Sequence, residues 1–81
     1  MNALGHNVVE LLAPRIGRVT ATNAVLLAAS KIGADPNRLT REDLPAVARD
    51  VSTILRVFLG PDAAAQIESS IVALAIDEVN S

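Results

Sequence analysis

One histidine and one glutamate are spaced so that their side chains could act together. His6 and Glu10 are four residues apart, and side chains at that spacing meet on the surface of an α-helix. A zinc site takes three or four protein ligands, yet the chain has no cysteine and no second histidine. We therefore interpret the two residues as a solvated surface pair and predict neither a metal site nor a cofactor.

Hydroxyl side chains capable of nucleophilic attack are grouped in short stretches: Thr20 with Thr22, Ser52 with Thr53, and Ser69 with Ser70. Nucleophilic catalysis needs a base beside the hydroxyl. The single histidine lies near the N-terminus on a polar helix face, so no set of nucleophile, base and orienting group can be assembled. The sequence predicts a protein that is not an enzyme.

Arginines are the remaining candidates for binding a charged ligand. Arg15 and Arg18 lie at the predicted start of a helix, where backbone N–H groups favour an anion, and form a candidate anion-binding site. Arg49 and Arg56 share the outward face of another predicted helix, as in a DNA-recognition helix. A net charge of −2 argues against nucleic acid as the partner. Surface arginines are most often simply solvated.

The composition predicts one small helical domain covering residues 1–81. Of the 81 residues, 51% are hydrophobic and Phe58 is the single aromatic residue, so the core must be aliphatic. The longest uncharged run, 19–30, is shorter than the ~20 residues that cross a membrane. No basic residue precedes the first apolar run, as one would in a secretory signal. We expect a cytoplasmic protein that has no contact with membranes.

Apolar residues recur with helical spacing in segments that predict helices over 3–13, 14–32, 41–59 and 62–79. Together they predict an all-α fold, a compact four-helix bundle. Asn2 is expected to cap the first helix and Pro14 to begin the second. Gly33 is expected to end the second helix, before a turn at Asp35-Pro36-Asn37. The sequence has no strand-like alternation and no evident internal repeat.

The third segment has the strongest local signals. Thr40 and Asp43 have the spacing of a capping box at its start, and Gly60 is placed to end it. Its apolar residues form one stripe, predicted to face the core: Leu44, Val47, Ala48, Val51, Ile54, Leu55 and Phe58.

The second and fourth segments have more apolar surface than a single core contact requires. The second is apolar around almost its whole circumference, and the fourth has two adjacent apolar stripes. The surplus residues Val25, Val72, Ile76 and Val79, together with Val57 on the polar side of the third segment, form a predicted protein interface. We predict a non-enzymatic protein-interaction module that forms a homodimer and has a regulatory or adaptor role. A carrier of an apolar ligand and a small DNA-binding domain using Arg49 and Arg56 are the alternatives.

Overall fold

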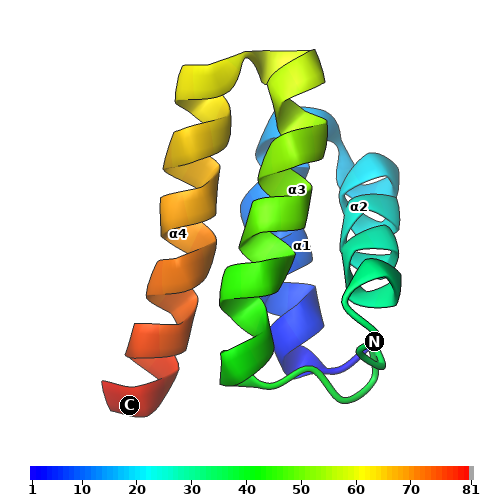
Figure 1. The fold of residues 1–81 in the computed structure, drawn as a ribbon, viewed down its shortest axis with the longest axis vertical. Coiled ribbons are helices and arrows are strands. Elements are labelled where there is room, and N and C mark those ends of the chain that lie inside the picture. Colours follow the sequence, from blue (N-terminus) through cyan, green and yellow to red (C-terminus); the bar gives the residue numbers. More distant parts are fainter. Residues whose placement is uncertain (81) are drawn as a thin grey trace.

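Residues 1–80 fold into four α-helices that run alternately up and down (Figure 1). The computed structural model describes the backbone of residues 1–80 and the side chains of residues 1–76. The helices are α1 (Ala3–Ile16), α2 (Arg18–Lys31), α3 (Leu44–Leu59) and α4 (Pro61–Asn80), and a turn of 3-10 helix, η1 (Arg41–Asp43), precedes α3. Figure 1 places α2 and α4 on opposite sides, with α3 in front of α1. The predicted four-helix bundle is confirmed.

The centre of the bundle is filled by aliphatic side chains from every helix. The largest fully buried side chains are Leu12, Leu44, Leu55, Ile71, Val8, Val25, Val47 and Val51. α3 packs most extensively against α4, and α1 against α2, while α2 also contacts α3. The molecule therefore consists of two helical hairpins, α1–α2 and α3–α4, packed against each other.

The break between the first two helices falls at Gly17 and not at Pro14, so the predicted boundary is wrong. Pro14 lies in the last turn of α1, because its fixed φ suits a helix even though it lacks an N–H donor. Gly17 has φ 86° and ψ 154°, a region that only glycine enters readily. Its N–H donates to the Ala13 carbonyl at 2.9 Å, which closes the last turn of α1.

Asn2 caps α1 as predicted and also fastens the N-terminus to the connection between α2 and α3. Its Oδ1 accepts from the Gly5 N–H at 3.0 Å. Its Nδ2 donates to the Leu39 carbonyl at 2.9 Å, and its backbone N–H donates to the Pro36 carbonyl at 3.1 Å. One residue thus orders both the start of α1 and the longest connection of the fold.

The predicted end of α2 and the turn that follows it are both confirmed. Gly33 has φ 72°, and the N–H of Ala34 donates to the Ala29 carbonyl at 2.9 Å. This pairing satisfies a carbonyl at the helix end that would otherwise lack a partner. The Asp35 carboxylate then accepts from the Asn37 N–H at 2.9 Å, as expected for a turn that begins at aspartate.

The start of α3 contains the predicted capping interaction, whereas its end departs from the prediction. The backbone N–H of Thr40 donates to the Asp43 carboxylate at 2.9 Å. Gly60 ends the helix, with φ 87°. Phe58 was expected in the buried stripe, but 66% of the residue is exposed. It lies in the last turn of α3, which extends beyond the upper end of α2 in Figure 1.

The two hairpins share one junction geometry and one pattern of burial. Gly60 has φ 87° and ψ 167°, close to the values at Gly17, and both junctions lie at the same end of the bundle (Figure 1). Adding 43 to a residue number takes Gly17 to Gly60 and pairs α1 with α3 and α2 with α4. Residues paired in this way are fully buried together: Val8 with Val51, Leu12 with Leu55, Ala21 with Ala64, and Ala28 with Ile71. The fold thus contains a repeated hairpin that the sequence did not reveal.

Candidate interaction surface

The predicted interface residues do not form a single surface. Val25 is fully buried between the helices of its own chain, so its assignment to a surface is wrong. Val72 is half-buried and packs against the core. Val57 is 84% exposed, near the end of α3, and Ile76 is 58% exposed, far along α4. Val79 lies outside the residues whose side chains the structure describes.

Surplus apolar surface does exist on α2, but on residues that the sequence analysis did not select. Val19 is 76% exposed, Leu27 is 49% exposed and Leu26 is 40% exposed. Together with the exposed Asn23 and Ser30 they follow the spacing of one helix stripe. We call these five residues the outer α2 face.

The opposite side of α2 explains why these larger side chains face solvent. The buried residues of α2 are mainly alanines: Ala21, Ala24, Val25, Ala28 and Ala29. Small side chains let a helix lie close to its neighbours, and α2 packs against both α1 and α3. The inner side of α2 is therefore filled by small residues, and its bulkier apolar side chains lie outside.

On α4, the matching helix of the second hairpin, polar residues face solvent and large apolar residues face the core. Adding 43 to the number takes Val19 to Asp62, Asn23 to Gln66, Leu26 to Ser69 and Leu27 to Ser70, and all of these α4 residues are exposed and polar. The inner positions of α4 instead hold isoleucines, at Ile67 and Ile71. The same structural positions are thus apolar outside in α2 and polar outside in α4.

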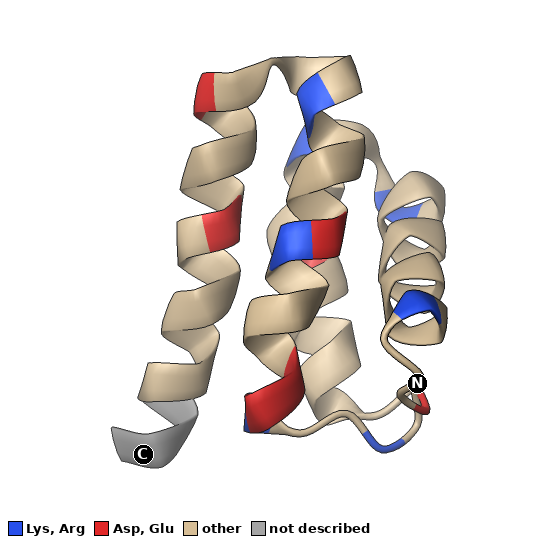
Figure 2. Cartoon of the chain, in the orientation of Figure 1, with Lys and Arg blue, Asp and Glu red and all other residues tan. Residues whose placement is uncertain are grey.

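Charge is absent from the outer α2 face. Figure 2 shows the charged residues of α2 only towards its two ends, which correspond to Arg18 and Lys31, whereas α4 has acidic residues near its start and partway along its length. Uncharged helix surface of this kind is unusual on a small soluble domain, because exposed helix faces are normally rich in charged residues.

Arg15 and Arg18, the candidate anion site, lie on different helices. Arg15 is in the last turn of α1, where a cation interacts favourably with the helix dipole, and not at a helix start as predicted. Arg18 begins α2 and forms an ion pair with Glu10 of α1, in which its Nη2 donates to Oε2 at 3.2 Å. This hydrogen bond lowers the pKa of Glu10 and raises the pKa of Arg18. An acidic side chain of the same protein therefore partners one of the two arginines.

The arginines of the DNA-binding alternative are both exposed on α3. Arg49 and Arg56 point to solvent, but Asp50 adjoins the first of them, and Figure 2 shows an acidic band beside a basic one midway along α3. Basic and acidic residues are interspersed over the helices in this view, and the side that it shows is not uniformly basic. Such a distribution does not resemble the clustered basic patch of a nucleic-acid-binding domain.

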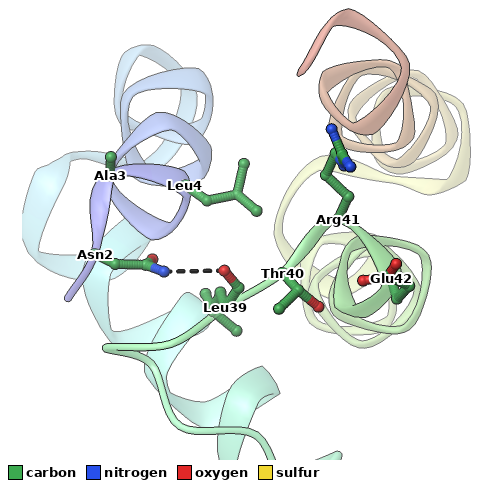
Figure 3. Close-up of a pocket in the computed structure, with 7 residues that line it drawn as sticks. All are labelled: Asn2, Ala3, Leu4, Leu39, Thr40, Arg41 and Glu42. Atoms are coloured by element: carbon green, nitrogen blue, oxygen red, sulfur yellow. Dashed lines mark hydrogen bonds between the residues drawn. The ribbon is translucent and has the colours of Figure 1, made fainter. Parts of the chain in front are cut away.

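A hollow of about 520 Å³ opens where the start of α1 meets the segment leading into α3. Its lining residues are Asn2, Ala3, Leu4, Leu39, Thr40, Arg41 and Glu42 (Figure 3). The side-chain amide of Asn2 donates a hydrogen bond to the Leu39 carbonyl, and this bond joins the two segments that line the hollow. In Figure 3 Arg41 extends towards the gap between α1 and α4, whereas Glu42 lies on the side of α3. The hollow is shallow and open, unlike the enclosed apolar pockets that hold small ligands.

Several hydroxyl groups considered as nucleophiles are occupied by local hydrogen bonds. Thr22, Thr53 and Ser70 each donate to the backbone carbonyl four residues earlier, at 2.8–3.0 Å. Ser52 is buried within α3. Among residues 1–76, no group of three or more His, Asp or Glu residues is placed to hold a metal ion, and His6 and Glu10 are both exposed.

Within the described part of the chain, none of the helices combines the length and the apolar character needed to cross a bilayer. Comparison of the chain with protein-family models, with curated proteins and with solved structures finds no match.

Proposed function

We propose that the protein is a non-enzymatic helical interaction module that self-associates through the outer α2 face. The observation that supports this proposal is the exposure of Val19, Leu26 and Leu27 on a charge-free helix side, where the matching side of α4 is polar. Exposed apolar stripes on small soluble domains commonly mark contact sites. In this role the chain would act as a regulator or adaptor that brings other components together.

The size of the face sets the expected strength of association. Burying a valine or leucine is worth ~1.5–3 kcal/mol, so covering the exposed parts of these three side chains in both copies contributes on the order of 5–10 kcal/mol. The entropic cost of association is about 4–15 kcal/mol. The gain exceeds the cost by at most about 6 kcal/mol, when the gain is at its upper end and the cost at its lower end, so the proposed dimer is weak, with a Kd between about 50 µM and 1 mM.

A small domain also gains from pairing. A chain of this length buries only about 60% of its unfolded surface and has limited stability by itself. The protein has no cysteine, so it has no disulfide that could stabilise it. Pairing through α2 would remove apolar surface from water and add stability without any change in the bundle.

Sedimentation equilibrium from about 10 µM to 1 mM tests the proposal. The wild-type protein should change from monomer to dimer over this range, and the double variant Leu26→Ser, Leu27→Ser should remain monomeric. These substitutions place on α2 the serines that α4 has at Ser69 and Ser70. Because both leucines are partly exposed, circular dichroism should show the helical fold of the variant unchanged.

Val57→Thr is the control, because it removes an exposed apolar residue of α3 that lies outside the outer α2 face. It should dimerise like the wild type. A wild-type protein that stays monomeric at 1 mM would contradict the proposal. Equal dimerisation of the wild type and the double serine variant would place the contact on another surface and would also contradict it.

A further inference from the structure

The end of the bundle that holds both hairpin junctions has the most exposed large apolar residues of the described chain. Val57 is 84% exposed, Val19 is 76% exposed and Phe58 is 66% exposed. Each lies within three residues of a junction glycine, Gly17 or Gly60. Both glycines lie at one end of the molecule (Figure 1), and a Cβ added at either of them would meet no atom within 4 Å. Apolar side chains therefore border an open surface at this end.

Phe58 continues the core stripe of α3 past the end of a neighbouring helix. It follows Val51 by seven residues and Leu44 by fourteen, which is close to whole turns of a helix, so it lies on the side of α3 that carries these two fully buried residues. The last turn of α3 extends beyond the upper end of α2 (Figure 1), so α2 does not cover Phe58. The single aromatic side chain of the protein is thus placed where a partner can extend the core.

The same end is basic, although the protein as a whole is acidic. Within four residues of the two junction glycines lie three basic residues, Arg15, Arg18 and Arg56, and one acidic residue, Asp62. The end therefore has a net charge of +2, which leaves −4 for the rest of the chain. Figure 2 shows basic bands near the upper ends of α2 and α3 and an acidic band near the start of α4. Among residues 1–76, Arg18 is paired with Glu10, whereas Arg15 and Arg56 form no ion pair.

We infer that the surface formed by Arg15, Arg56, Val57 and Phe58, which we call the junction surface, binds an acidic segment of another protein that has apolar side chains between its carboxylates. Arginine binds a carboxylate through two parallel hydrogen bonds, and such charge-assisted bonds are about twice as strong as neutral ones. Aromatic residues and arginine are enriched in protein interfaces, whereas lysine and glutamate are depleted. The residues within four positions of the two junction glycines include neither lysine nor glutamate. The outer α2 face contains no residue of the junction surface, so this inference is independent of the proposed self-association.

An anionic membrane also attracts arginine beside apolar residues, but the junction surface suits a membrane less well than an acidic protein segment. Lipid-binding segments have clusters of about four to eight basic residues, whereas this end has two arginines without an ion pair among residues 1–76. The exposed carboxylate of Asp62 would be repelled by anionic lipids across a broad surface. A narrow protein segment can contact the arginines and leave Asp62 in solvent.

Fluorescence anisotropy with a labelled synthetic peptide tests the inference. The peptide has about 20 residues, leucine and glutamate in a helical pattern, which is long enough to form a helix. The wild-type protein should bind it with a Kd on the order of 100 µM, and should bind the same peptide with lysine in place of glutamate at least about tenfold more weakly. The double variant Arg15→Gln, Arg56→Gln and the single variant Phe58→Ser should each weaken binding of the glutamate peptide at least about tenfold. Because these side chains are exposed, circular dichroism should show an unchanged helical fold.

Two matched variants control for net charge and for apolar exposure. The double variant Arg38→Gln, Arg49→Gln makes the same change in net charge at exposed arginines outside the junction surface. Ile76→Ser removes a 58% exposed apolar residue far along α4. Both should bind the glutamate peptide as the wild type does.

Three results would overturn the inference. The first is the absence of binding at about 1 mM protein. The second is equal weakening by the two arginine double variants, because the peptide would then respond to net charge alone. The third concerns vesicles of phosphatidylserine and phosphatidylcholine, which should not co-sediment with the protein. Co-sedimentation that Phe58→Ser abolishes would identify a membrane, and not a protein segment, as the partner.

Discussion

The two helical hairpins use the same glycine junction and bury many of the same positions, yet the outer sides of α2 and α4 differ in chemistry. On α4 the buried Ile67 and Ile71 face inward, and Ser69 and Ser70 face solvent. On α2 alanines face inward and leucines face outward. The same hairpin arrangement thus accommodates a helix whose larger apolar residues face the core and a helix whose larger apolar residues face solvent.

The difference shows that burial in this fold depends on position in the hairpin rather than on side-chain size. Ala28 and Ile71 are matched positions and both are fully buried, although their side chains differ greatly in volume. Since alanine is much smaller than isoleucine, we expect the neighbours of α2 to lie closer to its axis than the neighbours of α4 lie to the axis of α4. Substitutions at matched positions of the two hairpins test this difference between α2 and α4.

Ile71→Ala should cause the largest loss of stability, about 2–5 kcal/mol, because it leaves a cavity in the core beside α3. Chemical denaturation followed by circular dichroism measures the free energy of unfolding. Ser70→Ala, at an exposed neighbouring position, is the control and should change stability by less than about 0.5 kcal/mol. An Ile71→Ala protein as stable as the wild type would mean that α4 is not packed as described.

Ala28→Ile makes the opposite change at the matched position of α2. Ala28 is fully buried in the core, so we expect the larger side chain to overpack it and to cost about 1–3 kcal/mol of stability. The same denaturation measurement applies. A gain in stability would contradict the conclusion that α2 approaches its neighbours more closely than α4 does.

Gly17→Ala and Gly60→Ala test whether the two junctions are equivalent. No heavy atom lies within 4 Å of a Cβ added at either glycine, so the cost arises from the backbone conformation alone. That conformation is essentially restricted to glycine, and we expect each substitution to cost about 1–3 kcal/mol, with similar values for the two. Thermal and chemical unfolding measure both. A large loss of stability at one junction and none at the other would show that the two glycines, despite their similar backbone angles, do not contribute equally to the free energy of unfolding.

The smallest expected effect concerns the ion pair between Glu10 and Arg18, which has no counterpart at the matched positions of the second hairpin. The matched positions in the second hairpin are Thr53 and Pro61. The hydrogen bond from Arg18 lowers the pKa of Glu10 below its ordinary 4.5, so the stabilisation is present above pH 4.5 and is lost as pH falls through the lowered pKa. Because both side chains are exposed, the effect is expected to be slight.

Glu10→Gln should remove this part of the pH dependence and leave stability at neutral pH almost unchanged. Thermal unfolding of the wild type and the variant from pH 7 down to pH 3 measures the difference. Identical curves for the two proteins across that range would show that the ion pair does not contribute in solution.

The sequence predicted the features that depend on local chemistry. The cap at Asn2, the Thr40–Asp43 interaction, the turn at Asp35 and the helix end at Gly60 all follow from residue types whose preferences act over a few positions. The exception is the break at Gly17, where two adjacent signals competed. Proline is tolerated in the last turn of a helix, whereas the backbone angles at Gly17 are not helical.

The orientation of α2 could not be predicted from its residues. A helix that is apolar all round gives no preferred direction, so Val25 could not be distinguished from Leu26 and Leu27 as the outward residue. The direction depends on close packing of Ala21 and Ala28 against neighbouring helices, which is a tertiary effect. The repeated hairpin was hidden for a related reason, since most matched positions differ in residue type and agree only in burial.

We propose that the outer α2 face, unlike the matching side of α4, is covered by a second copy of the chain. Recording ¹H–¹⁵N NMR spectra from about 10 µM to 1 mM tests it most directly, because amide shifts report contact residue by residue across a range that brackets the expected Kd. The amides of Val19, Asn23, Leu26 and Leu27 should shift with concentration, and those of Asp62, Gln66, Ser69 and Ser70 should not. Spectra that do not change with concentration, or changes confined to α4 or to the end of α3, would contradict the claim.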